Sequence, residues 1–287
     1  MHLIKGKHHI SHSAAIILMV LTALLWSLGG LLIKMVNINP LAITGIRSLI
    51  GCIFLLALIR RPHFTWSFPQ IAGAVAFAGT VTTFVAATRM TTAANAILLQ
   101  YSAPVYVSLL GLWLLKERVR FLDILTLLVV LGGMVLFFLD GLQPGGLAGN
   151  IFGVISGVSF ACFFVFTRMQ KEGSPIETVL LGNILAALIG VPFAFAQWPD
   201  TTGWIVLVVL GIVQLGLPYI LYSIAIRHIT ALEAILTCTM EPVLNPLWVW
   251  LAIGEMPGKW AIAGGAIVVI AVTVRSIIAS RTNGVKV

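Results

Sequence analysis

Charged residues are scarce in this sequence: Asp, Glu, Lys and Arg make up only 9% of its 287 residues. A typical soluble protein carries roughly 25%. With 60% hydrophobic residues and a mean hydropathy of +1.08, the chain cannot cover a water-facing surface, which excludes a soluble globular protein. The net charge of +8 comes from basic residues that lie between apolar runs and form no basic stripe. This pattern predicts membrane topology and argues against nucleic-acid binding.

Cysteine and the usual catalytic residues are also scarce. The three cysteines, Cys52, Cys162 and Cys238, lie far apart inside apolar runs, which argues against a disulfide framework and against a metal site. The six histidines lie in the N-terminal segment or near loops, without metal-ligand spacing. An intramembrane enzyme needs a nucleophile with its base or a metal pair, and no Asp or His lies well inside an apolar run. A phosphate-binding glycine loop is missing too. We therefore expect no enzymatic activity, no cofactor and no metal.

Long apolar runs are abundant instead. Ten of them are long enough to cross about 30 Å of hydrocarbon as helices. Their limits are 14–34, 41–59, 68–88, 92–115, 120–139, 148–167, 176–197, 203–226, 231–253 and 259–279. Runs of this length favour helices over the shorter, alternating strands of a membrane barrel. The sequence predicts an all-α membrane protein with ten transmembrane helices.

The basic residues also predict an orientation. If the N-terminus is cytoplasmic, the cytoplasmic segments hold 13 Lys and Arg residues, the outer segments hold three, and Arg47 lies within a span. Cytoplasmic loops carry the excess of positive charge in membrane proteins. We expect both termini in the cytoplasm and the chain in the plasma membrane, which is the inner membrane in a bacterium.

One element of the chain occurs twice. Shifted by 138 positions, residues 89–117 align with residues 227–255, and ten of the 29 positions are identical. Each copy has a proline in mid-run, Pro104 or Pro242, which removes a backbone donor and predicts a helix break. Transporters build binding sites from repeated spans that are interrupted in this way.

The duplication divides the chain into two halves, 14–139 and 148–279. Five spans per half is an odd number, so the second half enters the membrane from the opposite side. The sequence therefore predicts two inverted five-helix repeats, a common plan for alternating access.

Two ionisable residues lie well inside the predicted spans, Arg47 and Glu241. Such a residue costs roughly 2.5–3.5 kcal/mol on insertion scales and is a functional candidate. Glu241 either binds a substrate amino group or a proton, or is a structural carboxylate paired with Arg47 or with a neighbouring helix. Arg47 either binds a substrate carboxylate, because its planar fork suits that group, or pairs with Glu241 or with helix-end carbonyls. For Arg47 we favour the pairing role.

Polar and aromatic residues complete the predicted substrate-binding wall: Asn245 and Trp248 share the helix face of Glu241, and the others lie on other spans. They are Trp26, Thr80, Thr83, Tyr101, Gln214, Tyr222, Asn245 and Trp248. A wall of this composition suits an amphipathic or aromatic metabolite. Taken singly, each hydroxyl or ring is equally explained by a bond to an adjacent helix.

Several short motifs follow one another along the chain in a fixed order. They are Trp26-Ser27 followed by Lys34, then Arg47, then Tyr101 to Val105 ending in Lys116-Glu117-Arg118, and Glu241-Pro242-Val243 ending in Gly254-Glu255. In this order and spacing the chain resembles the drug/metabolite transporter superfamily, specifically its ten-helix EamA type. The resemblance implies a secondary transporter that works without ATP, commonly an exporter of amino acids or other small metabolites.

We therefore expect a transporter, an exporter by resemblance, of amino acids or related small metabolites. The alternative is an exporter of cationic drugs or lipids in which Glu241 is the cation or proton site. The expected partners are a small-molecule substrate, the lipid bilayer and, through Glu241, a coupling proton. The chain is expected to be a monomer or a homodimer. Glycines at four-residue spacing, Gly149, Gly153 and Gly157, favour close packing within the molecule over a dimer seam.

Overall fold

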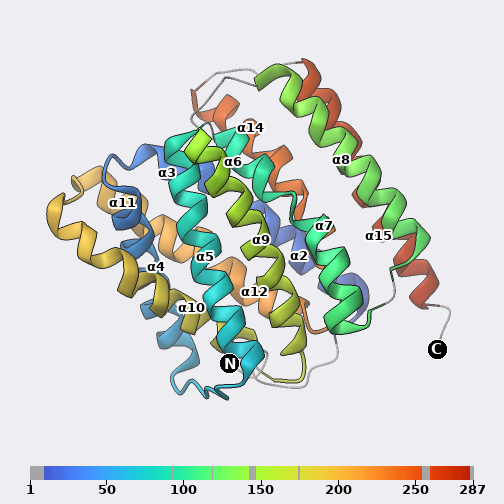
Figure 1. Ribbon diagram of the computed structural model, residues 1–287, viewed down its shortest axis with the longest axis horizontal. Coiled ribbons are helices and arrows are strands. Elements are labelled where there is room, and N and C mark those ends of the chain that lie inside the picture. Colours follow the sequence, from blue (N-terminus) through green and yellow to red (C-terminus); the bar gives the residue numbers. More distant parts are fainter. Residues whose placement is uncertain are drawn as a thin grey trace.

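The described part of the chain is entirely helical, and its helices form one bundle (Figure 1). The computed structural model describes residues 10–91, 93–117, 119–141, 147–173, 175–253 and 259–284. The α-helices are α2 His12–Trp26, α3 Gly29–Met35, α4 Pro40–Ile59, α5 Phe68–Met90, α6 Ala93–Gln100, α7 Ala103–Leu110, α8 Phe121–Gly141, α9 Leu147–Met169, α10 Pro175–Gly190, α11 Thr201–Val209, α12 Leu217–Ala225, α13 Ala231–Cys238, α14 Met240–Ile253 and α15 Lys259–Gly284. Two π-helical segments, η1 Gly111–Leu115 and η3 Leu210–Gly216, and one 3₁₀ segment, η2 Val191–Ala196, extend or join them.

Six helical stretches of the described chain are long and apolar enough to cross a membrane. They are His12–Met35, Pro40–Ile59, Phe68–Met90, Leu147–Met169, Pro175–Ala196 and Thr201–Ala225. Shorter apolar helices cover Ala103–Leu115, Phe121–Leu136 and Ile262–Arg275. The prediction of an all-α, multi-pass membrane protein is confirmed at this level.

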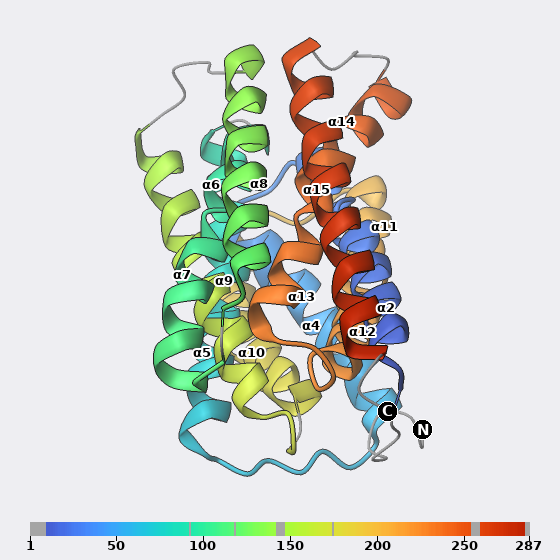
Figure 2. The same ribbon diagram turned by 90° about the vertical axis from the view of Figure 1, so that its right-hand side faces the viewer.

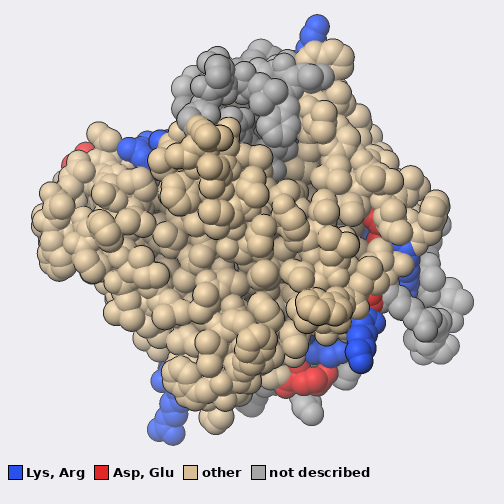
Figure 3. Space-filling model, viewed as in Figure 1, with Lys and Arg blue, Asp and Glu red and all other residues tan. Residues whose placement is uncertain are grey.

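Charge is distributed over the surface as a membrane requires. On the face in Figure 3, charged side chains lie at the margins and leave the middle uncharged. Large apolar side chains are exposed along the outer helices, for example Leu128 at 61% and Ile270 at 62%. Lipid, not water, is the solvent that such a surface requires.

Each copy of the duplicated element is broken at the same place. In the first copy α6 ends at Gln100 and α7 begins at Ala103; in the second, α13 ends at Cys238 and α14 begins at Met240. Gln100 and Cys238 are 138 positions apart, the offset of the repeat, and each lies four residues before a proline. A proline ring clashes with the carbonyl four residues earlier in a helix. The prolines thus set where both helices break.

The predicted span 14–34 is one of the six long apolar stretches, but its helix is interrupted between α2 and α3 at Ser27 and Leu28. No proline causes this break. Gly29 and Gly30 follow it, and the Ser27 hydroxyl donates to the Leu24 carbonyl. A side-chain bond of this kind competes with the backbone hydrogen bonds of a helix. The π-helical segment η3 is explained by a proline. Pro218 lies four residues after Gln214, so it cannot donate a helical hydrogen bond to the Gln214 carbonyl.

Small residues let the central helices touch. A Cβ on Gly157 of α9 would lie 2.9 Å from the Leu99 carbonyl oxygen of α6 and 2.8 Å from the Ser102 hydroxyl. A Cβ on Gly153 would meet the Leu99 side chain at 2.9 Å. The four-residue glycine spacing is therefore used for packing within the molecule, between α9 and the broken helix.

Helices α8 and α15 lie side by side on one outer face of the bundle (Figure 2). Gly133 of α8 meets α15 at Gly264, where an added Cβ would lie 3.0 Å from the carbonyl oxygen. Helix α2 begins and α15 ends at the same end of the bundle (Figure 2). The remaining helices enclose the central polar residues.

Candidate functional site

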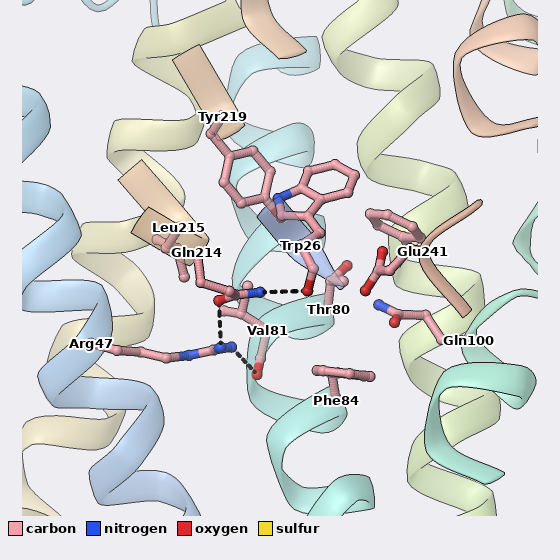
Figure 4. A pocket seen from close by; sticks show the side chains of 11 residues that line it. Trp26, Arg47, Thr80, Val81, Phe84, Gln100, Gln214, Leu215, Tyr219 and Glu241 are labelled. Atoms are coloured by element: carbon pink, nitrogen blue, oxygen red, sulfur yellow. Dashed lines mark hydrogen bonds between the residues drawn. The ribbon is translucent and has the colours of Figure 1, made fainter. Parts of the chain in front are cut away.

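A small cavity of about 30 Å³ lies at the centre of the bundle, beside the helix breaks (Figure 4). It is lined by Trp26, Arg47, Thr80, Val81, Phe84, Gln100, Phe160, Gln214, Leu215, Tyr219 and Glu241. These residues come from α2, α4, α5, α6, α9, η3, α12 and α14. The cavity therefore draws on both halves of the duplicated sequence.

Glu241 lies in the first turn of α14, directly after the break in the second copy. Its Oε2 accepts a hydrogen bond of 2.6 Å from the Tyr101 hydroxyl. Tyr101 lies in the break of the first copy, and its hydroxyl is also 2.7 Å from the Cys238 carbonyl, one of the carbonyls freed by proline. The two breaks thus meet through a single phenol. Tyr101 and Glu241 are both buried.

Arg47 reaches the cavity from α4 on the side opposite Glu241 (Figure 4). Its Nη1 donates to Gln214 Oε1 at 3.2 Å, and its Nη2 donates to the Val81 carbonyl at 3.2 Å. Among the described residues its buried Nε has no hydrogen-bond partner. Of the two pairings weighed for Arg47, with Glu241 or with backbone carbonyls, the one with Glu241 is not formed in this conformation, and the two charges face the cavity separately.

An aromatic cluster closes one side of the cavity. Trp26 packs against Phe160, Phe164, Tyr219 and Tyr222, with ring centroids 4.9 to 6.4 Å apart. These edge-on and tilted contacts are the preferred geometries of aromatic pairs. The Trp26 ring is held by α9 and α12, and its buried Nε1 has no partner among the described residues.

Five of the ten predicted substrate-binding residues do line the cavity, and Tyr101 bonds to one of them. The five are Trp26, Arg47, Thr80, Gln214 and Glu241.

The other four are engaged elsewhere. Asn245 Nδ2 donates to the Ser27 carbonyl at 3.1 Å, and Trp248 Nε1 donates to the Ser27 hydroxyl at 2.6 Å, so both hold the break between α2 and α3. Thr83 bonds the Gly79 carbonyl of its own helix. Tyr222 bonds Thr167 behind the aromatic cluster.

Six lining residues were not predicted from the sequence: Val81, Phe84, Gln100, Phe160, Leu215 and Tyr219. Two of them could have been found from the alignment of the two repeats. Phe160 occupies the position of Trp26 when the halves are aligned at an offset of 134, and Gln100 occupies the position of Cys238 at the offset of 138. The others are apolar or aromatic residues with nothing local to distinguish them from packing residues.

One ion pair ties the two halves together at the end where α2 begins. Glu117 Oε1 accepts from Arg168 Nε at 2.7 Å, and Glu117 Oε2 accepts from the first backbone N–H of α13, that of Ala231, at 3.1 Å. Arg168 Nη1 also donates to the carbonyls of Ile226 and Arg227 after α12. An anion thus meets a helix N-terminus and a cation meets a C-terminus, as the helix dipoles favour.

The chain was compared with known proteins. A model of the EamA-like transporter family matches residues 13–139 and 147–277. A protein of Archaeoglobus fulgidus named as an uncharacterized transporter is 29% identical over 262 residues, covering 89% of this chain and 93% of its own. The pseudopaline exporter CntI of Pseudomonas aeruginosa is 28% identical over 187 residues, covering 62% of this chain and 64% of its own.

The fold has a solved counterpart. One crystal structure superimposes with a TM-score of 0.78, covers 94% of this chain and 99% of its own, and is 22% identical in sequence, so it supports the fold alone. The family match covers nearly the whole chain and includes both copies of the duplicated element. The chain belongs to the EamA-like transporter family.

Proposed function

We propose that the chain is a secondary transporter that exports a small zwitterionic metabolite, such as an amino acid or a related compound. The observation that carries the proposal is the separation of opposite charges across one buried cavity, with Glu241 on one side and Arg47 on the other. A substrate ammonium group suits the carboxylate, and a substrate carboxylate suits the guanidinium. The relative that is named as a pseudopaline exporter supports the direction of transport.

The aromatic wall suits the remainder of such a substrate. Trp26, Tyr219 and Phe160 line the same cavity as the two charges, and Trp26 packs against both of the other rings. Apolar walls with a few placed polar groups are typical of small-molecule sites. Arg47 Nε and Trp26 Nε1 have no hydrogen-bond partner within the described part of the chain, and both are donors that a polar substrate can satisfy.

The size of the cavity implies a cycle of at least two conformations. About 30 Å³ has room for water but not for an amino acid. Ligand pockets for organic molecules are roughly 300–1,000 Å³. The cavity must therefore widen when substrate enters, and the conformation described here is one in which it is too small for the substrate.

Two inverted repeats supply the movement in this proposal. The repeats are residues 14–139 and 148–279, each with five spans, which gives ten transmembrane helices in all. The equivalent breaks after Gln100 and Cys238 support this arrangement, as does the location of the start of α2 and the end of α15 at one end of the bundle. We place that end in the cytoplasm because it carries the excess of basic residues. Rocking of one repeat against the other exposes the cavity to each side in turn.

Glu241 and Tyr101 provide a place for a coupling proton. When Glu241 is ionised, the Tyr101 hydroxyl donates to it. When Glu241 is protonated, the carboxyl donates to the Tyr101 oxygen, and the phenol proton turns to the Cys238 carbonyl, 2.7 Å away. The Glu241–Tyr101 hydrogen bond is kept in both states, with donor and acceptor exchanged, so the proton can be bound and released without breaking it.

A second candidate is the export of cationic drugs or lipids. The observation in its favour is that Glu241 has Tyr101 but no cation as its hydrogen-bond or ion-pair partner within the described residues, which leaves its negative charge open to an amine. In this alternative the carboxylate is the cation or proton site and Arg47 is structural.

Counterflow in proteoliposomes tests the proposal. Purified chain is reconstituted with a panel of unlabelled amino acids inside, and uptake of the labelled compound is measured. We expect counterflow of at least one zwitterion, a loss of tenfold or more in Glu241→Gln and in Arg47→Gln, and near-normal rates in Thr83→Val, which does not line the cavity. Flux of a cationic dye that survives Arg47→Gln, with no zwitterion transported, would contradict the first function and favour the second.

A further inference from the structure

Gln214 lies between two other groups of the cavity wall and bonds both of them (Figure 4). Its Oε1 accepts a hydrogen bond of 3.2 Å from Arg47 Nη1, and its Nε2 donates one of 3.5 Å to the Trp26 carbonyl. Gln214 and Arg47 are both buried. While the cavity is small, the amide oxygen of Gln214 therefore occupies one of the donors that Arg47 presents there.

Arg47 is a buried cation that has no paired anion. None of the ion pairs within the described residues includes it, and its Nη2 donates to the Val81 carbonyl. Both acceptors that the structure gives it are thus neutral oxygens. A buried charge without a counter-charge is costly. A guanidinium also binds a carboxylate more strongly than an amide, because both partners are then charged and the contact can be bidentate. A carboxylate that reaches Arg47 should therefore displace a neutral acceptor.

Of the two acceptors, only the one on Gln214 belongs to a side chain. The Val81 carbonyl is part of the backbone of α5. The Gln214 amide, in contrast, is at the end of a flexible side chain and lies against Gly29, where an added Cβ would be 2.8 Å from Nε2. Gly29 offers no side chain that could hold the amide in place. The amide of Gln214 is thus the acceptor that can leave Arg47.

The backbone around Gln214 also favours movement. Gln214 lies in the π-helical segment η3, and Pro218 leaves its carbonyl without a helical donor. Hydrogen bonds that are already missing need not be broken when the segment adjusts. Short π-helical turns are frequent at functional sites. The local structure therefore allows the side chain of Gln214 to change its position.

We infer that Gln214 is the specificity-determining residue of a carboxylate subsite, in which its amide oxygen occupies the place on Arg47 that a substrate carboxylate oxygen takes. The inference rests on the proposed function and specifies the acidic group that the cavity recognises. When substrate binds, the amide turns away and the carboxylate bonds Arg47. Arg47 is the one cation among the described residues that line the cavity, which favours a singly charged carboxylate over a phosphate.

The same exchange explains how the substrate is released. A carboxylate that leaves a buried guanidinium leaves its donors unsatisfied, which is costly. Gln214 offers a neutral replacement, so Arg47 regains an acceptor as the substrate departs. Without the amide oxygen, a carboxylate should bind more tightly and leave more slowly. Damage to packing would instead weaken binding.

Two variants of Gln214 separate these roles. Gln214→Met keeps an unbranched side chain but has no oxygen to occupy Arg47, so a carboxylate should bind about fivefold more tightly, the effect of one hydrogen bond. Gln214→Glu places a carboxylate of the chain itself against Arg47 and should weaken the binding of a free carboxylate by about tenfold or more. Thr83→Val, which does not line the cavity, is the control and should keep the wild-type affinity.

The test measures the melting temperature of the purified full chain in detergent micelles against probe concentration, which gives an apparent affinity. One probe is phenylpropionate, a carboxylate without an amine, and the other is phenethylamine, an amine without a carboxylate. The phenyl ring of both suits the aromatic wall at Trp26. The two Gln214 variants should shift the affinity for phenylpropionate in opposite directions, and neither should weaken the binding of phenethylamine.

Unchanged or weaker binding of phenylpropionate to Gln214→Met would overturn the inference, as would undiminished binding to Gln214→Glu. Phenylpropionate that binds neither wild type nor Gln214→Met would overturn it too. Equal weakening for both probes would show a packing role and have the same consequence. Gln214→Glu is close to glutamine in shape, so it keeps the test decisive if Gln214→Met does not fold.

These outcomes are separate from the transport assay, because no flux is measured. If zwitterion counterflow fails while the variants distinguish the two probes as expected, the carboxylate subsite stands and the proposed function does not. If counterflow succeeds while the variants do not distinguish the probes, the proposed function stands and the role of Gln214 is refuted. Where both hold, Gln214→Met should slow counterflow although it binds the zwitterion more tightly.

Discussion

At the scale of single residues, the phenol of Tyr101 is the contact that joins the two copies of the repeat. It is fully buried and is within hydrogen-bond distance of two acceptors, Glu241 Oε2 and the Cys238 carbonyl. A buried acceptor that loses its donor keeps the full cost of having left water. We therefore expect the Tyr101 hydroxyl to contribute more to stability than the buried area of its ring.

Tyr101→Phe should lower the free energy of unfolding by about 1–3 kcal/mol, because a buried carboxylate and a carbonyl both lose their donor. It should also slow substrate exchange, since Glu241 is no longer oriented. Unfolding in mixed detergent micelles and counterflow measure the two effects. Tyr106→Phe, on the half-buried side of α7, is the matched control and should behave as wild type. Equal behaviour of the two variants would contradict the role given to the phenol.

At the scale of elements, the broken helices follow from local chemistry and the contacts between helices follow from glycine. Pro104 and Pro242 place each break four residues earlier, at Gln100 and Cys238, so the positions of the breaks were predictable. The break at Ser27 was not, because no proline marks it and because the groups that hold the Ser27 carbonyl and hydroxyl, Asn245 and Trp248, lie on another helix. At Gly157, α9 comes into close contact with the first broken helix.

Gly157→Ala should destabilise the chain by about 1–3 kcal/mol, because the new Cβ meets backbone oxygens of α6 that cannot rotate away. The strain falls next to Tyr101, so transport should fall as well. Gly132→Ala is the matched control: nothing lies within 4 Å of its added Cβ, and alanine is the better helix former. The comparison uses the melting temperature of each variant. A Gly157→Ala protein as stable as Gly132→Ala would refute the close approach.

At the scale of the whole molecule, the proposed arrangement is a pair of repeats inserted in opposite directions. This arrangement predicts that the end of the first copy of the duplicated element and the end of the second copy face opposite sides of the membrane. Lys116 precedes Glu117 at the end of the first copy, and Lys259 begins α15 after the second. Both side chains are exposed, so both accept a label.

Lys116→Cys and Lys259→Cys, made separately in a chain whose three native cysteines are replaced by alanine, should react with a membrane-impermeant maleimide from opposite sides. Lys116→Cys should react only after the membrane is opened, and Lys259→Cys in intact cells. Arg61→Cys, in the loop before α5, should follow Lys116→Cys. Labelling of Lys116→Cys and Lys259→Cys from one side would rule out the inverted repeats and, with them, alternating access by rocking.

The sequence alone determined the features that depend on neighbours along the chain. Hydrophobic length decided which segments are membrane helices, because the bilayer selects for apolar runs. The repeat offset and the two prolines decided where the duplicated helices break, because the proline clash acts over four residues. The ionisable residues that matter in the cavity, Arg47 and Glu241, were identified by the cost of placing a charge in a membrane.

Only the tertiary structure decided which charges meet. The sequence left open whether Arg47 pairs with Glu241 or with backbone carbonyls, and the structure shows it bonded to Gln214 and to the Val81 carbonyl, across the cavity from that carboxylate. Asp123 and Arg275 are 152 positions apart and form a buried ion pair. The rotation and tilt of each helix set these pairings, and long-range packing fixes both. Sequence spacing along one helix does not contain that information.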